Sequence, residues 1–271
     1  MNPEPKHTGA TAGRARLFVP LAFVLLFILT SSLPAQDAGR IKIADGEYLS
    51  RGQSGYNKDE KFRESWVLWR KGDGKFMVES DLQVEGTGKN QQVLHYSIQL
   101  SADMRLLEIT TRAGENETLI ELGAEEVRVK GRRGESTLKV PPRYDFYLPL
   151  PWCLGSFARR VPPIKSAGLP VMFVAADEQG PDSPMALTML WGRVQWVGSE
   201  QVDAAGLRVD AEKYLVHLGP YPGVFIWLSK NGLMLASQNE ENPEQRTETA
   251  RFREYEKLPR LLRDPQQKPA N

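Results

Sequence analysis

The stretch WVLWRKGDGKFMVESDLQV, residues 66–84, contains two short segments joined by a glycine-rich turn. After the turn, apolar side chains recur at alternate positions, namely Phe76, Val78, Leu82 and Val84. Polar side chains fill positions between them, at Glu79, Asp81 and Gln83. Alternation with a period of two predicts a β-strand with one buried and one wet face. Because antiparallel sheets commonly leave one face in water, the stretch predicts an antiparallel hairpin.

The same alternation recurs along the chain, in segments 94–100, 127–130 and 137–140. Short turn signals separate such segments. We predict hairpin turns at residues 72–74, 102–103, 204–206 and 231–232. Asp-Gly and Asn-Gly pairs are strong hairpin signals because they accept the positive φ angles of tight turns. The pattern predicts a mainly β protein with a curved antiparallel sheet, or half-barrel.

In one long segment, from Leu207 onward, the apolar residues switch from odd-numbered to even-numbered positions. Val209 and Ala211 occupy one parity, and the apolar positions from Tyr214 onward occupy the other. One extra residue in a strand produces such a slip, so the pattern predicts a β-bulge near Glu212.

Residues 141–170 interrupt the β pattern with a crossover rich in proline and aromatic residues. Its prolines are Pro141, Pro142, Pro149, Pro151, Pro162, Pro163 and Pro170. Proline is tolerated in the first turn of a helix and disrupts a helix interior. We therefore predict a short helix that begins at Pro151, runs toward Arg160 and is stopped by Pro162.

The chain opens with the pattern of an export signal. Arg14 and Arg16 precede thirteen uncharged residues, 17–29, and then a small or turn-forming run that ends at Ala35. Thirteen residues are too few for a membrane-spanning helix, which needs about twenty. The pattern predicts cleavage after Ala35 and a periplasmic or extracellular protein with no stable membrane anchor.

We predict that the chain has three parts. Residues 1–35 are the signal peptide, residues 36–258 one β-rich domain, and residues 259–271 a disordered tail with prolines and glutamines. Without the leader the chain keeps 32 basic and 33 acidic residues. A nearly neutral chain has no overall charge that would draw it onto nucleic acid or an anionic membrane, so nucleic acid is not expected as a partner.

Catalytic and metal-binding patterns are weak in this chain. Past the leader, the strongest metal ligands are His95, His217 and the single Cys153, so neither a metal nor another cofactor is expected. Cys153 has no intramolecular disulfide partner, and we expect it to be inert and buried. Ser54 and Ser156 lie in stretches that only superficially resemble a nucleophile elbow. We therefore predict a non-enzyme, and a serine hydrolase using either serine with one of the histidines ranks last.

Aromatic side chains are the main functional lead. The candidate ligand-binding residues are Trp66, Trp69, Tyr144, Phe146, Trp152, Phe157, Trp191 and Trp227. Large aromatics most often fill a core, and that interpretation is the commoner one. The alternative is that a curved sheet leaves a concave apolar face, covered by the crossover, that holds an acyl chain or another apolar ligand.

Several of these features together carry a family resemblance. They are the leader, the hairpin at 66–74, the crossover, the stretch 206–214 and the hairpin at 227–232. With these features the chain resembles an uncharacterised bacterial periplasmic family with a lipoprotein-carrier-like (LolA/LolB-like) half-barrel. The resemblance covers most of residues 41–256. It implies a half-barrel wrapped around a helical segment and binding of a lipid or a lipidated partner, and it carries over no catalytic residue.

The sequence therefore predicts an exported protein that binds an apolar ligand, a lipid or acyl chain, or an envelope partner without catalysis. A second hypothesis is a structural or assembly adaptor that docks envelope proteins through exposed sheet edges.

Overall fold

The computed structural model describes residues 39–51, 61–85, 93–148, 150–156, 158–165, 168–177 and 186–257. Gly39–Asn271 form one compact unit that contains all described strands and both hydrophobic cores. The predicted signal peptide and tail lie outside the described residues. Within the described ranges, every helix is too short or too polar to span a bilayer.

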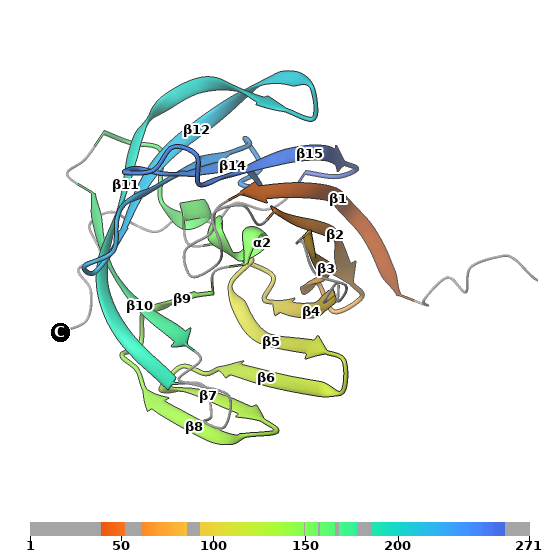
Figure 1. Cartoon of the computed structure of the whole chain (residues 1–271), viewed down its shortest axis with the longest axis vertical. Helices are drawn as coiled ribbons and strands as arrows, with labels where there is room; N and C mark the ends of the chain where they lie inside the picture. Colours follow the sequence, from red (N-terminus) through yellow and green to blue (C-terminus); the bar gives the residue numbers. More distant parts are fainter. Residues whose placement is uncertain are drawn as a thin grey trace, which may run out of the picture. The chain divides into compact units, whose positions relative to one another are not determined.

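The protein is mainly β, as predicted, and its strands curl around a short helix (Figure 1). The first eight strands are β1 (Arg40–Arg51), β2 (Lys61–Lys71), β3 (Phe76–Glu85), β4 (Val93–Leu100), β5 (Leu106–Ala113), β6 (Asn116–Leu122), β7 (Glu126–Gly131) and β8 (Gly134–Lys139). The crossover holds β9 (Asp145–Tyr147), helix α2 (Pro151–Leu154) and the 3₁₀-helix η1 (Ala158–Arg160). The remaining strands are β10 (Leu169–Asp177), β11 (Ala186–Ala204), β12 (Leu207–Leu218), β13 (Val224–Leu228), β14 (Met234–Asn239) and β15 (Arg246–Glu254).

These strands make one sheet in the order β8-β7-β6-β5-β4-β3-β2-β1-β15-β14-β13-β12-β11-β10-β9. The chain builds one half as a meander from β1 to β8, crosses to the far edge, and returns from β9 to β15, which pairs with β1. All pairs are antiparallel except the short parallel pair of β9 with β10. The edge strand β8 also contacts β11, so the curved sheet folds back toward itself.

The four predicted hairpin turns are confirmed. At the first, the Lys71 and Lys75 backbones are hydrogen-bonded (2.8 Å) and Gly74 has a φ of +79°. At the last, the Ser229 N–H donates to the Leu233 carbonyl (2.8 Å). At 204–206 the two central residues, Ala205 and Gly206, both have positive φ angles, which matches the right-handed twist of the flanking strands.

The crossover helix is shorter than predicted. Pro151 does begin helix α2, but the helix ends at Leu154, with Gly155 as its C-cap, and η1 is a separate turn. A Cβ atom at Gly155 would lie only 3.0 Å from the Cβ of Met234, so the backbone meets β14 closely at that point. We attribute the early end to this packing, which a continuous helix toward Arg160 would disturb.

The predicted bulge near Glu212 is wrong in position. The extra residue is Val197 in the neighbouring strand β11, because Trp196 pairs with Tyr214 and Gly198 with Lys213. The buried positions of β12 shift from odd to even numbers because the two halves of the strand are buried on opposite faces of the sheet.

Tyr214, Val216 and Leu218 belong to the main core, whereas Ala211 belongs to a second core. This second core contains Ala204, Ala211, Trp227, Leu235 and Ala236. It lies where the far part of the long β11–β12 hairpin contacts β14 and β15.

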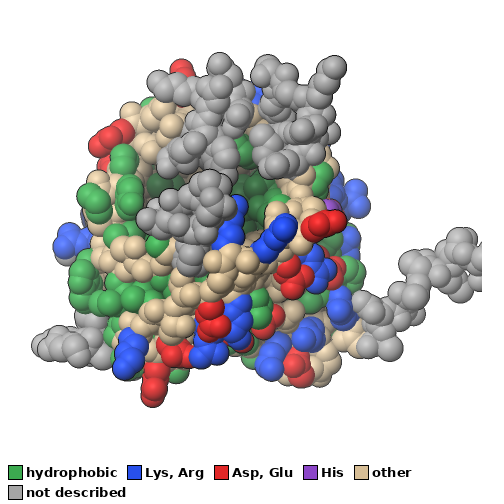
Figure 2. Space-filling view, turned by 60° about the horizontal axis from the view of Figure 1, so that its bottom comes forward, with side chains coloured by type: hydrophobic (Ala, Val, Ile, Leu, Met, Phe, Trp, Pro, Cys, Tyr) green, Lys and Arg blue, Asp and Glu red, His purple; other side chains and the backbone are tan. Residues whose placement is uncertain are grey.

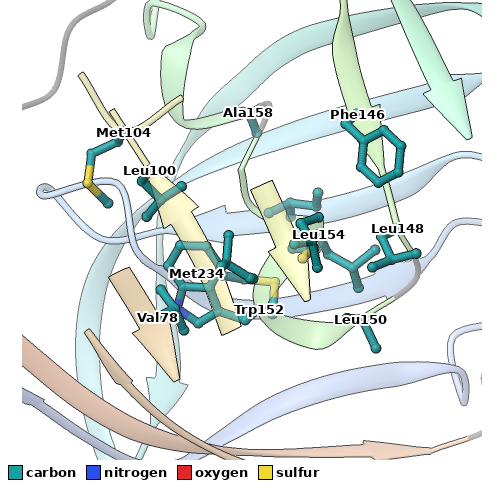
Figure 3. Close-up of a cluster of buried hydrophobic side chains, with 14 of the residues drawn as sticks. Val78, Leu100, Met104, Phe146, Leu148, Leu150, Trp152, Leu154, Ala158 and Met234 are labelled. Atoms are coloured by element: carbon teal, nitrogen blue, oxygen red, sulfur yellow. The ribbon is translucent and has the colours of Figure 1, made fainter. Parts of the chain in front are cut away.

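The main core fills the interior of the curved sheet around the crossover. Figure 3 shows Phe146, Leu148, Leu150, Trp152 and Leu154 of the crossover beside Val78 and Leu100 of the sheet. Trp152 is only 2% exposed. Burial of such large aromatic side chains contributes about 1.5–3 kcal/mol or more each to folding. The crossover is therefore an integral part of the core.

Candidate functional site

The structure separates the eight aromatic candidates. Trp66, Phe146 and Trp152 belong to the main core, and Tyr144 is half-buried against it. Trp227 lies in the second core, where its indole N–H donates to Glu200 (2.5 Å). Trp69 is half-buried, and its indole N–H donates to Glu79 (2.9 Å). Trp191 is 58% exposed, and Phe157 lies outside the described residues. The candidates therefore do not form one site.

A buried carboxyl group lies at the centre of the interior. Glu64 is fully buried on β2, on the same face as Phe62 and Trp66. Its Oε1 accepts a hydrogen bond from the Ser80 hydroxyl (2.8 Å), and its Oε2 accepts one from the backbone N–H of Trp152 (2.9 Å). Glu64 thus connects the crossover to the sheet.

The environment of Glu64 favours the neutral carboxyl group. Burial raises its pKa from 4.5 to about 8, although the bonds from Ser80 and Trp152 oppose the shift. The neutral form is also satisfied by the surrounding groups. A protonated Oε1 can donate to the Ser80 Oγ, whose own proton can then go to the Ser65 carbonyl oxygen (3.1 Å). A neutral carboxyl group avoids the cost of a buried charge.

The sequence analysis missed Glu64, although a signal was present. Glu64 occupies the apolar parity of its strand, between Phe62 and Trp66, where a carboxylate interrupts the alternation. A charged side chain on the core face is rare unless it is paired or neutralised. That one position predicted a buried polar contact, but not its partners.

Three other polar residues surround the helix. The Tyr48 hydroxyl donates to the Met234 carbonyl (2.9 Å), and the Arg159 Nε donates to the Gly232 carbonyl (2.7 Å) while the guanidinium lies over the Trp152 ring. Burial, together with the nearby Glu64, raises the pKa of Cys153 and of Tyr48 well above the usual range. The Cys153 thiol is therefore held in its protonated, unreactive form.

A second region lies where the edge strand β8 approaches β11, and we call it the mouth. Its residues are half-buried apolar side chains that pack against the main core, Leu122, Leu138, Val140, Tyr144 and Leu190. They come from β6, from β8 and the segment after it, and from β11. Figure 2 faces the end of the sheet where β6, β7 and β8 lie, and hydrophobic side chains line a hollow there.

The mouth also contains polar groups. The Tyr144 hydroxyl donates to the Gly123 carbonyl (2.8 Å), and burial raises the pKa of Tyr144 to about 12 despite the opposing charge of Arg105. Arg105 is exposed, and its guanidinium has no hydrogen bond within the described residues. Burial opposes the shift, but the Ser101 hydrogen bond and the charge of Arg105 lower the pKa of Asp103, so Arg105 lies near a carboxylate as well as near Tyr144. Apolar surface beside an exposed cation suits an amphiphile with a negative head group.

The hydrolase candidates do not meet in the structure. His95 contacts Asp81 (2.5 Å), and His217 lies 4.0 Å from Glu240. Ser156 is buried, and no hydrogen bond joins it to either histidine in the described part of the chain. Ser54 lies outside that part. A search of the described residues finds no group of three metal-ligating side chains.

Two solved structures resemble this fold. One is a β-barrel-like protein of a domain of unknown function, DUF1849, from Brucella abortus, with a TM-score of 0.50 and 13% identity over 81% of this chain and 100% of that one. The other is a DUF1089 family protein from Pseudomonas aeruginosa, with a TM-score of 0.38 and 15% identity over 64% of this chain and 87% of that one. No protein-family model matches the chain, and no curated protein is significantly similar to it.

At such identity, the likeness to the DUF1849 protein bears on the fold alone. Its β-barrel-like architecture agrees with the curved sheet described above. The lipoprotein-carrier resemblance stays a prediction.

Proposed function

We propose that the protein is exported and binds an anionic amphiphile, such as a fatty acid or lipid, at the mouth, without catalysing a reaction. The observation that carries the proposal is the set of half-exposed apolar side chains at the mouth, next to a completed core. Apolar surface that remains partly open beside a filled interior is typical of ligand sites. The lipoprotein-carrier resemblance supports the same ligand class.

Arg105 supports a negative head group on the ligand. Its charge reaches Tyr144, whose pKa it lowers, so the guanidinium lies beside the apolar side chains of the mouth. A carboxylate or phosphate can accept two parallel hydrogen bonds from one guanidinium. The tail of the ligand would then lie against Leu138 and Leu190.

Palmitate should bind to residues 36–271 and displace a fluorescent fatty acid. Leu138→Arg should weaken palmitate binding by about tenfold or more. The substitution replaces apolar surface that contacts the acyl tail with a charge, which should cost at least ~1.4 kcal/mol of binding free energy. The matched control is Leu207→Arg, since Leu207 is exposed at the start of β12, outside the mouth. Equal affinity in the two variants, or no palmitate uptake by the unchanged protein, would contradict the proposal.

The head-group assignment has its own test. Arg105→Gln should weaken binding of palmitate by roughly tenfold, because it removes a charge-assisted hydrogen bond. Binding of hexadecanol, which has the same tail and no charge, should stay unchanged. If displacement titrations show that the affinities for palmitate and hexadecanol fall equally, Arg105 does not recognise the head group.

Export is tested by the N-terminus of the processed chain. Expressed with its own leader in a bacterium that has a periplasm, the protein should be recovered outside the cytosol and begin at Gln36. Deletion of residues 17–29 should retain it in the cytosol, because the apolar segment is what the export machinery binds. Protein sequencing that finds Met1 in a cytosolic fraction of the unchanged protein would refute export.

A further inference from the structure

The outer side of β11 carries an exposed aromatic and apolar patch. Trp191 and Met189 are 58% and 44% exposed. They alternate with Leu190, which packs against the main core, so their side chains lie on the opposite, outward side of the strand. A tryptophan exposed to this degree is unusual, because large aromatics normally bury most of their surface.

Neighbouring segments extend this patch. The N–H of Gly219 donates to the Trp191 carbonyl (2.7 Å), which brings the turn with the exposed Tyr221 beside Trp191. On the other side, a Cβ atom at Gly168 would lie 2.6 Å from the Arg193 side chain. The exposed Ile164 and Lys165 come shortly before Gly168 in the chain.

The charges of the patch are positive and available. Arg193 and Lys165 are exposed, and neither has a hydrogen bond or ion pair in the structure of the described residues. Several other exposed cations of this sheet are paired, as Arg112 is with Glu117 and Arg208 with Asp203. Glu240, the nearby carboxylate across β12, lies 4.0 Å from His217. The patch thus combines two available cations with amphipathic aromatic side chains.

We propose that this patch docks the protein on an anionic membrane surface. Tryptophan and tyrosine favour the interfacial layer of a bilayer, where their rings contact acyl chains and their polar groups stay hydrated. Arg193 and Lys165 would contact lipid phosphates, which attract basic side chains near the surface. Docking of this kind is peripheral and reversible, because interfacial side chains and phosphate contacts hold the protein at the surface. The patch does not include the mouth, so docking does not depend on the proposed ligand.

Vesicle binding tests the proposal directly. Residues 36–271, which contain the compact unit, are mixed with vesicles of phosphatidylcholine alone or of equal parts phosphatidylcholine and phosphatidylglycerol. The protein should float with the phosphatidylglycerol vesicles and not with phosphatidylcholine alone. Trp191→Ala with Tyr221→Ala, and separately Arg193→Gln with Lys165→Gln, should each weaken binding by about tenfold or more.

Two controls separate membrane docking from other causes. Leu207→Ala removes an apolar side chain that is even more exposed (67%) and lies outside the patch, and it should leave vesicle binding unchanged. The emission of Trp191, obtained as the difference from Trp191→Phe, should shift to shorter wavelength only with the anionic vesicles.

Three results would overturn the proposal. They are no binding of the unchanged protein to either vesicle, binding by both double variants that equals that of the unchanged protein, and a dimer in solution that Trp191→Ala with Tyr221→Ala dissociates. The dimer would identify a second copy of the chain as the occupant of the patch. The palmitate titration uses the mouth variants, so either proposal can fail while the other holds.

Discussion

Gly192→Ala should lower the free energy of unfolding by about 3 kcal/mol or more, whereas Gly198→Ala in the same strand should change it by less than about 0.5 kcal/mol. At position 192 a new Cβ would overlap the backbone carbonyl oxygen of His217 and lie 2.7 Å from the Phe173 ring. The carbonyl belongs to the paired strand β12, so it cannot move without breaking the ladder. Overpacking against backbone is therefore relieved only by distorting the sheet.

The control position is open. A Cβ at Gly198 meets no atom within 4 Å, so alanine adds no strain there. Urea denaturation of the three proteins, with equal slopes to show unchanged unfolding, measures the difference. If the two alanine variants are equally stable, the close packing of β10, β11 and β12 around Gly192 is not as described.

The second large effect is a fall in stability as the pH rises, caused by Glu64. Its pKa is about 8 in the folded protein against 4.5 for an ordinary glutamate, so the folded state holds the proton longer than the unfolded state. The stabilisation is complete below about pH 4.5 and is lost as the pH rises through about 8. The free energy of unfolding should fall by roughly 3–5 kcal/mol across this window and then level off.

Glu64→Gln should remove this pH dependence. The amide oxygen can still accept from the Trp152 N–H, and the amide nitrogen can donate to the Ser80 hydroxyl, but the side chain no longer titrates. At about pH 9 the variant should be the more stable protein. Tyr48 and Cys153, which face the same interior, have raised pKa values and keep their protons across the window.

Glu117→Gln is the matched control, because Glu117 is an exposed carboxylate paired with Arg112. It should keep the full pH dependence of the unchanged protein. Denaturation midpoints of the unchanged protein and both variants, measured from about pH 4.5 to about pH 9, give the three pH profiles to compare. A Glu64→Gln profile that still falls with pH would show that another group titrates in the interior.

Much of the fold follows from local chemistry that the sequence displays. The turns at 72–74 and 231–232 were predictable because their conformation depends on a few adjacent residues that tolerate positive φ. Which alternate residues of β3 and β4 are buried was also predictable, because it depends on the alternation of apolar and polar neighbours along each strand. The crossover was recognisable from its prolines, and its helix start from Pro151, but its end depends on contact of Gly155 with Met234, eighty residues away in a different part of the sheet.

The candidate sites were less predictable. Trp191 and Trp66 look alike in the sequence, yet one is exposed and the other is 1% exposed. The difference arises because each face of a strand is defined by what the rest of the chain places against it. Trp227 shows a third outcome, since the long β11–β12 hairpin covers it on the side of the sheet away from the main core.

Sequence alone determined the strand class, the hairpin turns and the proline-rich crossover, because these depend on neighbours along the chain. Only the tertiary structure decided which aromatics meet, that Glu64 is buried beside Trp152 as a neutral group, and that half-exposed apolar side chains gather where β8 approaches β11. Those features depend on contacts between segments far apart in the chain, such as Glu64 with Trp152 and strand β8 with β11, and no local pattern encodes such distances.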